Sequence, residues 1–547
     1  MNERTKKGLD CIEAALLLGV LGDVLLRATP WGINVLLWAL ALGLAVVALT
    51  ARWRSQLYRE QGRWLILPVL FFAAAFVWRD SQTLKSLDIL SLLLALGLVA
   101  WRAKGGNIRL AGVMEYALGM TAVGFNTLFA FFPLVLTDVR WKEIPQGGWS
   151  RHALAVLRGL IIALPLLTVF GLLFMAADAV FEGLVNNVLH INFDRLFTHL
   201  FLVIFFTWFA GGYLRGVVLG KEGWWINNQT PISLGLDTPA AAAVGSTGNE
   251  AKEVAKEKVL PAAQALRMGI VELGVVLGLL NLLFLSFVVV QIRYFFGGAA
   301  LVQVTTGLTY AEYARRGFFE LVTVAALVLP LLLAAHWILR KDNPAHERTF
   351  RVLASIQLVL LFVIMASAVG RMRLYQSQYG LTELRIYTTA FMGWLALVFV
   401  WFVLTVLRGE RARFMYGALV AAFLMVGVLH VINPDALIVR VNVSQVRAGR
   451  GFDAAYVSSL SADAVPSLVE ALPAMNHYEQ CVATTSLLRR YDELARGDWR
   501  TWNLSRSRAL RAIEGNTTGL REVVCPQTPY AAPLVPAVAV PMREAEN

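Results

Sequence analysis

The chain has 547 residues, of which 57% are hydrophobic and 16% charged, and its mean hydropathy is +0.61. This composition excludes a soluble multidomain protein and requires a polytopic membrane protein. The formal charge of +12 comes mostly from Arg and Lys in short loops, as the positive-inside bias produces, so we expect no nucleic-acid partner.

Apolar stretches long enough to cross a bilayer, which takes roughly 20 residues, recur along the chain. They predict an all-α polytopic membrane bundle of about 12 transmembrane helices, within the range 11–13. The first seven stretches fall in an N-terminal set, 1–219, and the last five in a C-terminal set, 265–433. Between them, 220–264 has too few bulky side chains to bury, so we expect a flexible linker and loop. The stretches are 11–27, 31–50, 64–78, 84–101, 110–136, 153–177, 196–217, 266–292, 316–338, 350–370, 386–407 and 414–432.

The basic residues in the loops of the first half predict a cytoplasmic N-terminus. If every stretch crosses the membrane, however, the basic loops of the second half fall on the opposite side, and one crossing fewer would bring the two sets together. Either the stretch 110–136, which carries Glu115 and three glycines, does not cross simply, or one half departs from the rule. In the second half, the Arg and Lys residues of four loops all favour the same side of the membrane. We therefore expect the C-terminal domain to be extracytoplasmic.

The hydrophobic runs stop after Pro434, and 434–524 reads as a small soluble helical domain. Amphipathic patterns and cap residues predict helices at 453–460, 461–472, 477–496 and 498–514. Five prolines then predict a disordered tail at 525–547. Cys481 and Cys525 would pair in an oxidising compartment and would be two ordinary thiols in the cytoplasm, and the sequence leaves both open.

The first candidate site begins where charges precede the apolar run 316–338. Thr309 and Glu312 have capping-box spacing, so a helix is expected to start at Thr309. Glu312, Arg316 and Glu320 then share one face, with Arg315 beside them. Unpaired charges in lipid cost about 2.5–3.5 kcal/mol each. This face should therefore point into the bundle or water, either as a cap at the headgroup level or as a binding site.

The second candidate site is the loop expected between 350–370 and 386–407, rich in Arg and Tyr. By helix alternation it emerges on the same membrane face as the first group, together with Arg293. Arginine and tyrosine converging there suit a phosphate or carboxylate, although an interfacial belt that anchors helices is the alternative. The candidate ligand-binding residues are Arg293, Glu312, Arg315, Arg316, Glu320, Arg371, Arg373, Tyr375, Tyr379 and Arg385.

Other sequence patterns give weaker indications of function. Asp178, Glu182, His190, Asp194 and His199 could hold a divalent cation, but their spacing matches no metal motif, so no metal site is predicted. Gly274 and Gly278 form a GxxxG pattern that predicts close helix packing. The chain has no P-loop, GxSxG, HExxH or Rossmann glycine pattern, so we predict no catalytic residue and no cofactor.

Several runs, among them Asn281-Leu-Leu-Phe to Gln291-Ile-Arg-Tyr294, Tyr310 to Leu321 and Arg373-Leu-Tyr375 to Tyr379-Gly-Leu381, match a known pattern in the order of their charged and aromatic residues. Over about 150–435 the chain resembles a bacterial family of polytopic membrane proteins known as domains of unknown function, the four-one-seven-three family, with the four-one-five-three family close by. The resemblance implies a protein of the bacterial inner (cytoplasmic) membrane without an established activity, so it transfers no catalytic residue.

Three functional hypotheses follow. The leading one is a non-enzymatic, transporter-like or sensing bundle whose Arg/Glu/Tyr face binds a small anion or a lipid headgroup. The second is a membrane enzyme acting on a lipid-linked substrate, with Glu312 or Glu320 as base. The third is a structural subunit whose C-terminal domain docks a protein partner. Membrane lipid is the expected surrounding in each.

Overall fold

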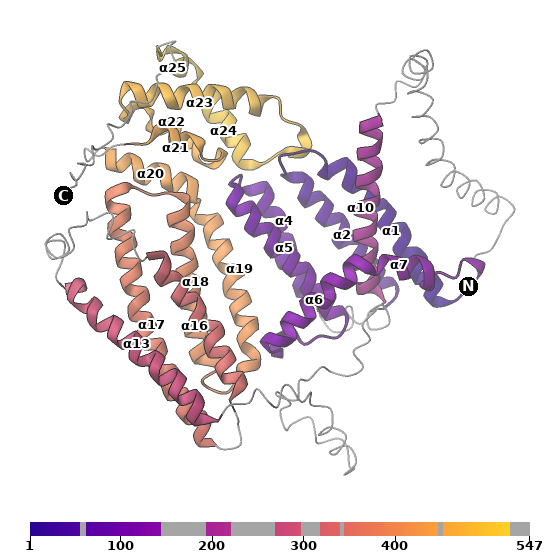
Figure 1. The fold of residues 1–547 in the computed structure, drawn as a ribbon. Helices are drawn as coiled ribbons and strands as arrows, with labels where there is room; N and C mark the ends of the chain where they lie inside the picture. Colours follow the sequence, from indigo (N-terminus) through magenta and orange to yellow (C-terminus); the bar gives the residue numbers. More distant parts are fainter. Residues whose placement is uncertain are drawn as a thin grey trace, which may run out of the picture. The chain divides into compact units, whose positions relative to one another are not determined.

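The computed structural model describes residues 1–54, 62–143, 193–219, 269–296, 318–339, 344–446 and 452–525, and the elements in these ranges are all helices (Figure 1). The all-α prediction is confirmed. The chain forms two compact units. Unit 1 contains Met1–Pro434 together with Asp498–Leu504, and unit 2 contains Asp435–Gly497 together with Ser505–Asn547.

The first helices of unit 1 alternate in direction. They are α1 (Glu3–Leu26), α2 (Ile33–Arg52), α4 (Ile66–Trp78) and α5 (Gln82–Ala103). Asp10, early in α1, accepts a 2.9 Å hydrogen bond from Trp53, which follows α2. At the other end, Trp31 before α2 lies 6.4 Å from the ring of Phe76 near the end of α4. The end that holds the start of α1 is called the basic end, because Arg52, Arg102, Arg109 and their neighbours lie there.

Helix α10 (Phe193–Val218) runs antiparallel to α1. At the basic end, Asp138 accepts hydrogen bonds from Arg4 of α1 at 2.8 Å and from Arg215 of α10 at 2.5 Å. At the opposite end, His199 of α10 lies 2.6 Å from Asp23 of α1. Polar contacts therefore hold both ends of this helix pair.

Glycines let α10 lie so close to its neighbouring helices that no room remains for a Cβ atom. A Cβ on Gly19 of α1 would lie 1.9 Å from Oγ1 of Thr207. A Cβ on Gly212 of α10 would lie 2.1 Å from the carbonyl oxygen of Thr127. No real Cβ fits at such distances, so the two positions exclude every larger residue unless the helices move apart.

The stretch 110–136 forms a bent pair and does not run through unit 1. It contains α6 (Val113–Phe129), α7 (Phe131–Pro133) and the π-helical turn Leu134–Asp138, with a bend of 46° between α6 and the rest. Just before it, the Arg109 guanidinium lies 5.7 Å from the Trp64 ring at the basic end, and Asp138 ends it on Arg4. Between these points it packs against Gly97 of α5 and Gly211 of α10, within the last two turns of both helices. The segment thus enters and leaves at the basic end.

The second half of unit 1 packs five helices around its own core. They are α13 (Ile270–Phe296), α16 (Phe318–Ile338), α17 (Pro344–Tyr379), α18 (Glu383–Thr405) and α19 (Phe414–Ile432). Phe318, Phe350, Phe399 and Phe402 are fully or almost fully buried in that core.

One prediction for these helices is wrong, and a second finds no support among the described residues. Helix α17 does not stop near residue 370 but continues through Gly370, Arg371 and Arg373 to Tyr379, and it ends before Gly380, which has φ of 72°. The loop expected there is only a short turn. A Cβ on Gly274 or Gly278 would meet no atom within 4 Å, so the close packing predicted for this pair is absent from the described residues.

Eight helices of the described ranges are long and apolar enough to cross a membrane, or nine if the bent pair is one span. The polytopic architecture is confirmed, whereas the number of twelve is not reached. Helix α1 contains the acidic residues Asp10, Glu13 and Asp23, and α4 has only 13 residues. The stretch 153–177 lies outside the described residues.

A short segment near the C-terminus, Asp498–Leu504, caps helices made from the first 80 residues. The last carbonyl groups and first amide groups of a helix have no partner within it and need one from elsewhere. The segment satisfies four of them: Val24 O accepts from Arg500 at 2.6 Å, Ile33 N donates to Trp502 O at 2.9 Å, and Phe76 O and Arg79 O accept from Asn503 at 2.7 and 2.8 Å. We call this end of unit 1 the capped end. Hydrogen bonds from Arg500 also lower the pKa of the Asp498 carboxyl.

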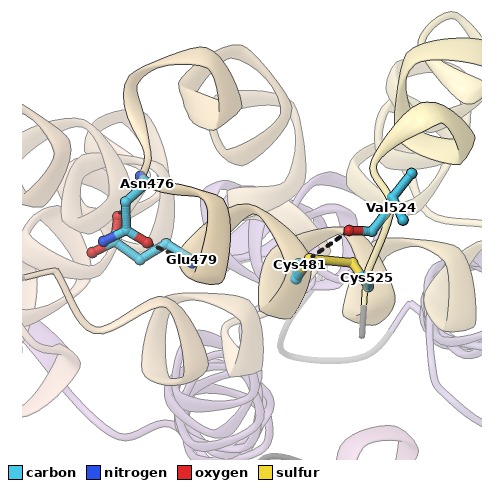
Figure 2. The surroundings of a disulfide bond; sticks show 5 residues. All are labelled: Asn476, Glu479, Cys481, Val524 and Cys525. Atoms are coloured by element: carbon cyan, nitrogen blue, oxygen red, sulfur yellow. Dashed lines mark hydrogen bonds between the residues drawn. A yellow bond between two sulfur atoms is a disulfide. The ribbon is translucent and has the colours of Figure 1, made fainter. Parts of the chain in front are cut away.

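Unit 2 is built of short helices, as the sequence predicted. They are most of α20 (Pro434–Val446), then α21 (Ala454–Ser459), α22 (Val465–Ala471), α23 (His477–Ala495), α24 (Leu504–Glu514) and α25 (Thr517–Glu522). Asn476 and Glu479 form a capping box at the start of α23 (Figure 2). Figure 2 also shows the disulfide that joins Cys481 to Cys525, whose Cα atoms lie 5.5 Å apart. The pairing that the sequence left open is therefore present.

Candidate functional site

The predicted Arg/Tyr site is partly assembled where α17 ends and α18 begins. The Arg385 guanidinium lies 4.1 Å from the centre of the Tyr375 ring, and the rings of Tyr375 and Tyr379 are 5.2 Å apart. Arg385 also donates to the carbonyl oxygens of Tyr379, at 3.1 Å, and of Gly380. Arg385 thus caps the end of α17, and the two tyrosines pack beside it.

The other predicted residues are placed less closely. Arg373 is exposed and Arg371 half-buried in the last turns of α17, and Glu320 is exposed in the first turn of α16. The backbone of Arg293 belongs to α13, but its side chain is outside the described part of the chain. Glu312, Arg315, Arg316 and the expected helix start at Thr309 lie outside it as well. The structure therefore brings together Tyr375, Tyr379 and Arg385.

The carboxylate and histidine cluster of the sequence is divided. Asp178, Glu182 and His190 lie outside the described residues. His199 of α10 bonds instead to α1: its Nδ1 lies 2.6 Å from Asp23, and its Nε2 lies 2.7 Å from Nη1 of Arg27. Because an arginine can only donate, Nε2 is the acceptor, and Nδ1 carries the proton that is donated to Asp23. The imidazole of His199 therefore bridges Arg27 and Asp23 of α1.

The most deeply buried polar pair was not predicted from the sequence. Asp88 of α5 and His430 of α19 are both fully buried, and His430 Nε2 lies 3.2 Å from Asp88 Oδ2. The other ring nitrogen, Nδ1, lies 2.9 Å from the carbonyl oxygen of Val426. Figure 1 shows α5 and α19 side by side, and the two helices are in contact. The pair links the first half of unit 1 to its last helix.

Further charges surround this pair. Arg79, which follows α4, donates from Nε to the His430 carbonyl oxygen at 2.8 Å and so caps the end of α19. Lys85, one turn before Asp88, is buried and lies 2.6 Å from Asp80. The Trp78 ring lies 5.8 Å from the imidazole of His430. Near the same end, the hydroxyls of Ser81 and Tyr387 of α18 are 3.2 Å apart, so four elements meet here.

A second buried ion group lies at the basic end. The Asp138 side chain has no exposed surface, and it contacts the buried Arg215 and the half-exposed Arg4. Its two oxygens are divided between the two arginines, which is a strong, charge-assisted arrangement. The group joins α1, α10 and the end of the bent segment.

The sequence did contain a signal for these residues. Asp88 interrupts the apolar stretch 84–101, and His430 lies inside the apolar stretch 414–432. An ionisable residue within a membrane segment is costly and marks a candidate functional position. What the sequence could not supply is the pairing, because Asp88 and His430 are 342 residues apart.

A family model described as "Domain of unknown function (DUF4153)" matches residues 66–471. The match begins at α4 and extends into unit 2, so it covers Asp88 and His430 as well as the Arg/Tyr residues. It corrects the resemblance in one respect: of the two families named, the four-one-five-three family is the one whose model matches, over a longer range than expected. No curated protein and no solved structure matches the chain. The family model covers well over half of the chain, which therefore belongs to the DUF4153 family.

Proposed function

We propose that this membrane protein is a transporter-like or sensing bundle that binds a small anion or an anionic lipid headgroup where α17 ends and α18 begins. The observation that carries the proposal is the joint presence there of Arg385, Tyr375 and Tyr379, with Arg373 exposed on the same helix end. Arg385 is occupied by the helix end, so the proposal assigns the binding of the anion to the exposed Arg373 in the last turns of α17.

Removing the exposed arginine tests this site. Hydrogen bonds to charged groups contribute about 1.5–3 kcal/mol, so Arg373→Ala should weaken anion binding roughly 10-fold to 100-fold. The measurement is the rise in melting temperature of the purified chain on titration with inorganic phosphate, and separately in nanodiscs with and without phosphatidylglycerol. A response to phosphate identifies a soluble ligand, and a response to the lipid alone identifies a headgroup.

The matched control is Arg348→Ala, which removes an exposed arginine near the other end of α17. It should leave both responses as they are in the wild type. Equal responses in the wild type and Arg373→Ala would contradict the proposal, and so would loss of both responses in the control.

We further propose that the basic end faces the cytoplasm and the capped end faces the outside of the bacterial inner membrane. The return of the bent segment to the basic end supports this orientation, because it removes the single crossing that set the loops of the two halves against each other. Cations of both halves then share one side. The disulfide between Cys481 and Cys525 fits an oxidising compartment outside.

Fusion reporters check this orientation. Alkaline phosphatase fused after Cys525 should be active, because that enzyme needs an oxidising compartment for its own disulfides, and a green fluorescent protein at that position should stay dark. The same two reporters fused after Lys104, at the basic end, should behave in the opposite way. A fluorescent fusion after Cys525 would contradict the proposed orientation.

A further inference from the structure

We propose that Asp88 and His430 form a proton-binding site within the membrane part of the protein, distinct from the Arg/Tyr site above. The hydrogen bonds of His430 define how many protons the pair holds. The carbonyl oxygen of Val426 can only accept, so Nδ1 of the imidazole must carry a hydrogen. One further proton then lies between Nε2 and Asp88 Oδ2, which are 3.2 Å apart.

That further proton is required for the contact itself. With it, the pair is either an imidazolium facing a carboxylate or a neutral imidazole facing a carboxylic acid, and both are attractive. Without it, the lone pair of Nε2 faces a carboxylate oxygen, which is repulsive. The contact between α5 and α19 at this point therefore depends on whether the proton is bound.

Because the pair is buried, binding or losing the proton has a large electrostatic effect on it. Neither side chain has appreciable exposed surface, and Asp88 Oδ1 is buried with no hydrogen-bond partner among the described residues. In such surroundings a change of one charge is not screened by water. Loss of the proton should consequently separate Asp88 from His430 rather than leave the two groups facing each other.

The charged groups around the pair leave both states accessible. They are Arg79 from the end of α4, Lys85 from α5 and Asp80 from the turn between them, and together they carry one net positive charge. The protonated pair adds no net charge to this group, and the deprotonated pair adds one negative charge that balances it. Tyr387 of α18 and Ser81 face the same end as neutral hydroxyl groups. Loss of one proton thus converts a group with one net positive charge into a neutral one.

The position of the pair relates this proton to the rest of unit 1. His430 is two residues from the end of α19, and its carbonyl oxygen is held by Arg79, whose own carbonyl oxygen accepts from Asn503. A displacement of His430 is therefore passed to the capping segment through two hydrogen bonds. This connection is what a proton-driven transporter or a pH sensor requires: a buried titrating group joined to an element that can move.

The experiment measures proton uptake of the full chain in lipid nanodiscs between about pH 9 and pH 5, a range that brackets an ordinary histidine. A pH-indicator dye gives the number of protons taken up, and infrared difference spectra identify carboxyl and imidazole groups. Asp88→Asn keeps the shape and can still donate to Nε2, but it cannot titrate. It should take up about one proton per chain fewer than the wild type, because the pair shares a single titrating proton.

A second variant and a control complete the design. His430→Gln removes the other member of the pair and should lose the same proton and the same infrared bands, so a folding failure of one variant leaves the other to decide. His336→Gln removes a different buried histidine, on α16, and should keep that proton. Uptake by both pair variants equal to that of the wild type, or the same loss in the His336 control, would overturn the proposal.

Discussion

Asp138→Ala should lower the free energy of unfolding by about 3–5 kcal/mol, the range observed when one partner of a buried ion pair is removed. The Asp138 carboxylate is fully buried, and its loss leaves Arg215 buried without a counter-charge, whereas Arg4 can turn to water. Three elements meet at this carboxylate, so the loss should also loosen α10 from α1. The measurement is the melting temperature of the purified protein in detergent, followed by tryptophan fluorescence.

Glu410→Ala is the matched control, because it removes a carboxylate from an exposed pair with Arg413 at 2.7 Å. Exposed pairs contribute about 0–1 kcal/mol, so its melting temperature should stay near that of the wild type. If Asp138→Ala melted at the same temperature as Glu410→Ala, the ion group at the basic end would have no structural role.

Gly212→Ala should be the second most damaging change. The added methyl group would lie 2.1 Å from the carbonyl oxygen of Thr127, and a backbone atom cannot move aside without moving its helix. Overpacking of this kind costs about 1–3 kcal/mol, and more where the backbone is rigid. We expect a lower melting temperature and a loosened contact between α10 and α6.

Gly124→Ala is the control, and it should change the stability in the opposite direction. A Cβ on Gly124 meets no atom within 4 Å, so alanine there is free of clashes and should stabilise α6 by about 0.5–1 kcal/mol through helix propensity. Both variants replace a helical glycine by alanine, and the surroundings alone differ. A melting temperature for Gly212→Ala at or above that of Gly124→Ala would contradict the close approach of α10 and α6.

The helices of this protein were predictable because their signals are local. Runs of apolar residues gave nearly every described membrane helix, and amphipathic patterns, with Ser461 as a cap, gave most of the short helices of unit 2. The extent of α17 was not predicted, because hydropathy falls at Arg371 while the helix itself continues past Gly370 to Tyr379 and ends before Gly380. Hydropathy reports the surroundings of a helix and not its backbone.

The buried polar groups were harder to predict because their partners are distant in the sequence. Asp138 and Arg215 are 77 residues apart, and Asp88 and His430 are 342 apart. In the sequence each is a single ionisable residue, and nothing near it identifies its partner. Residues that are clustered in the sequence, from Arg371 to Arg385, gave the stronger pattern. Of these, Arg385 serves chiefly to cap a helix.

The capping role of Asn503 has a consequence for how the protein is made. The carbonyl group of Arg79, which Asn503 completes, leaves the ribosome 424 residues earlier than its partner. The ends of α1, α2 and α4 at the capped end therefore stay incompletely bonded until Asp498–Leu504 has been synthesised. A premature stop codon anywhere before Asp498 would therefore leave α1 and α2 without these hydrogen bonds at the capped end.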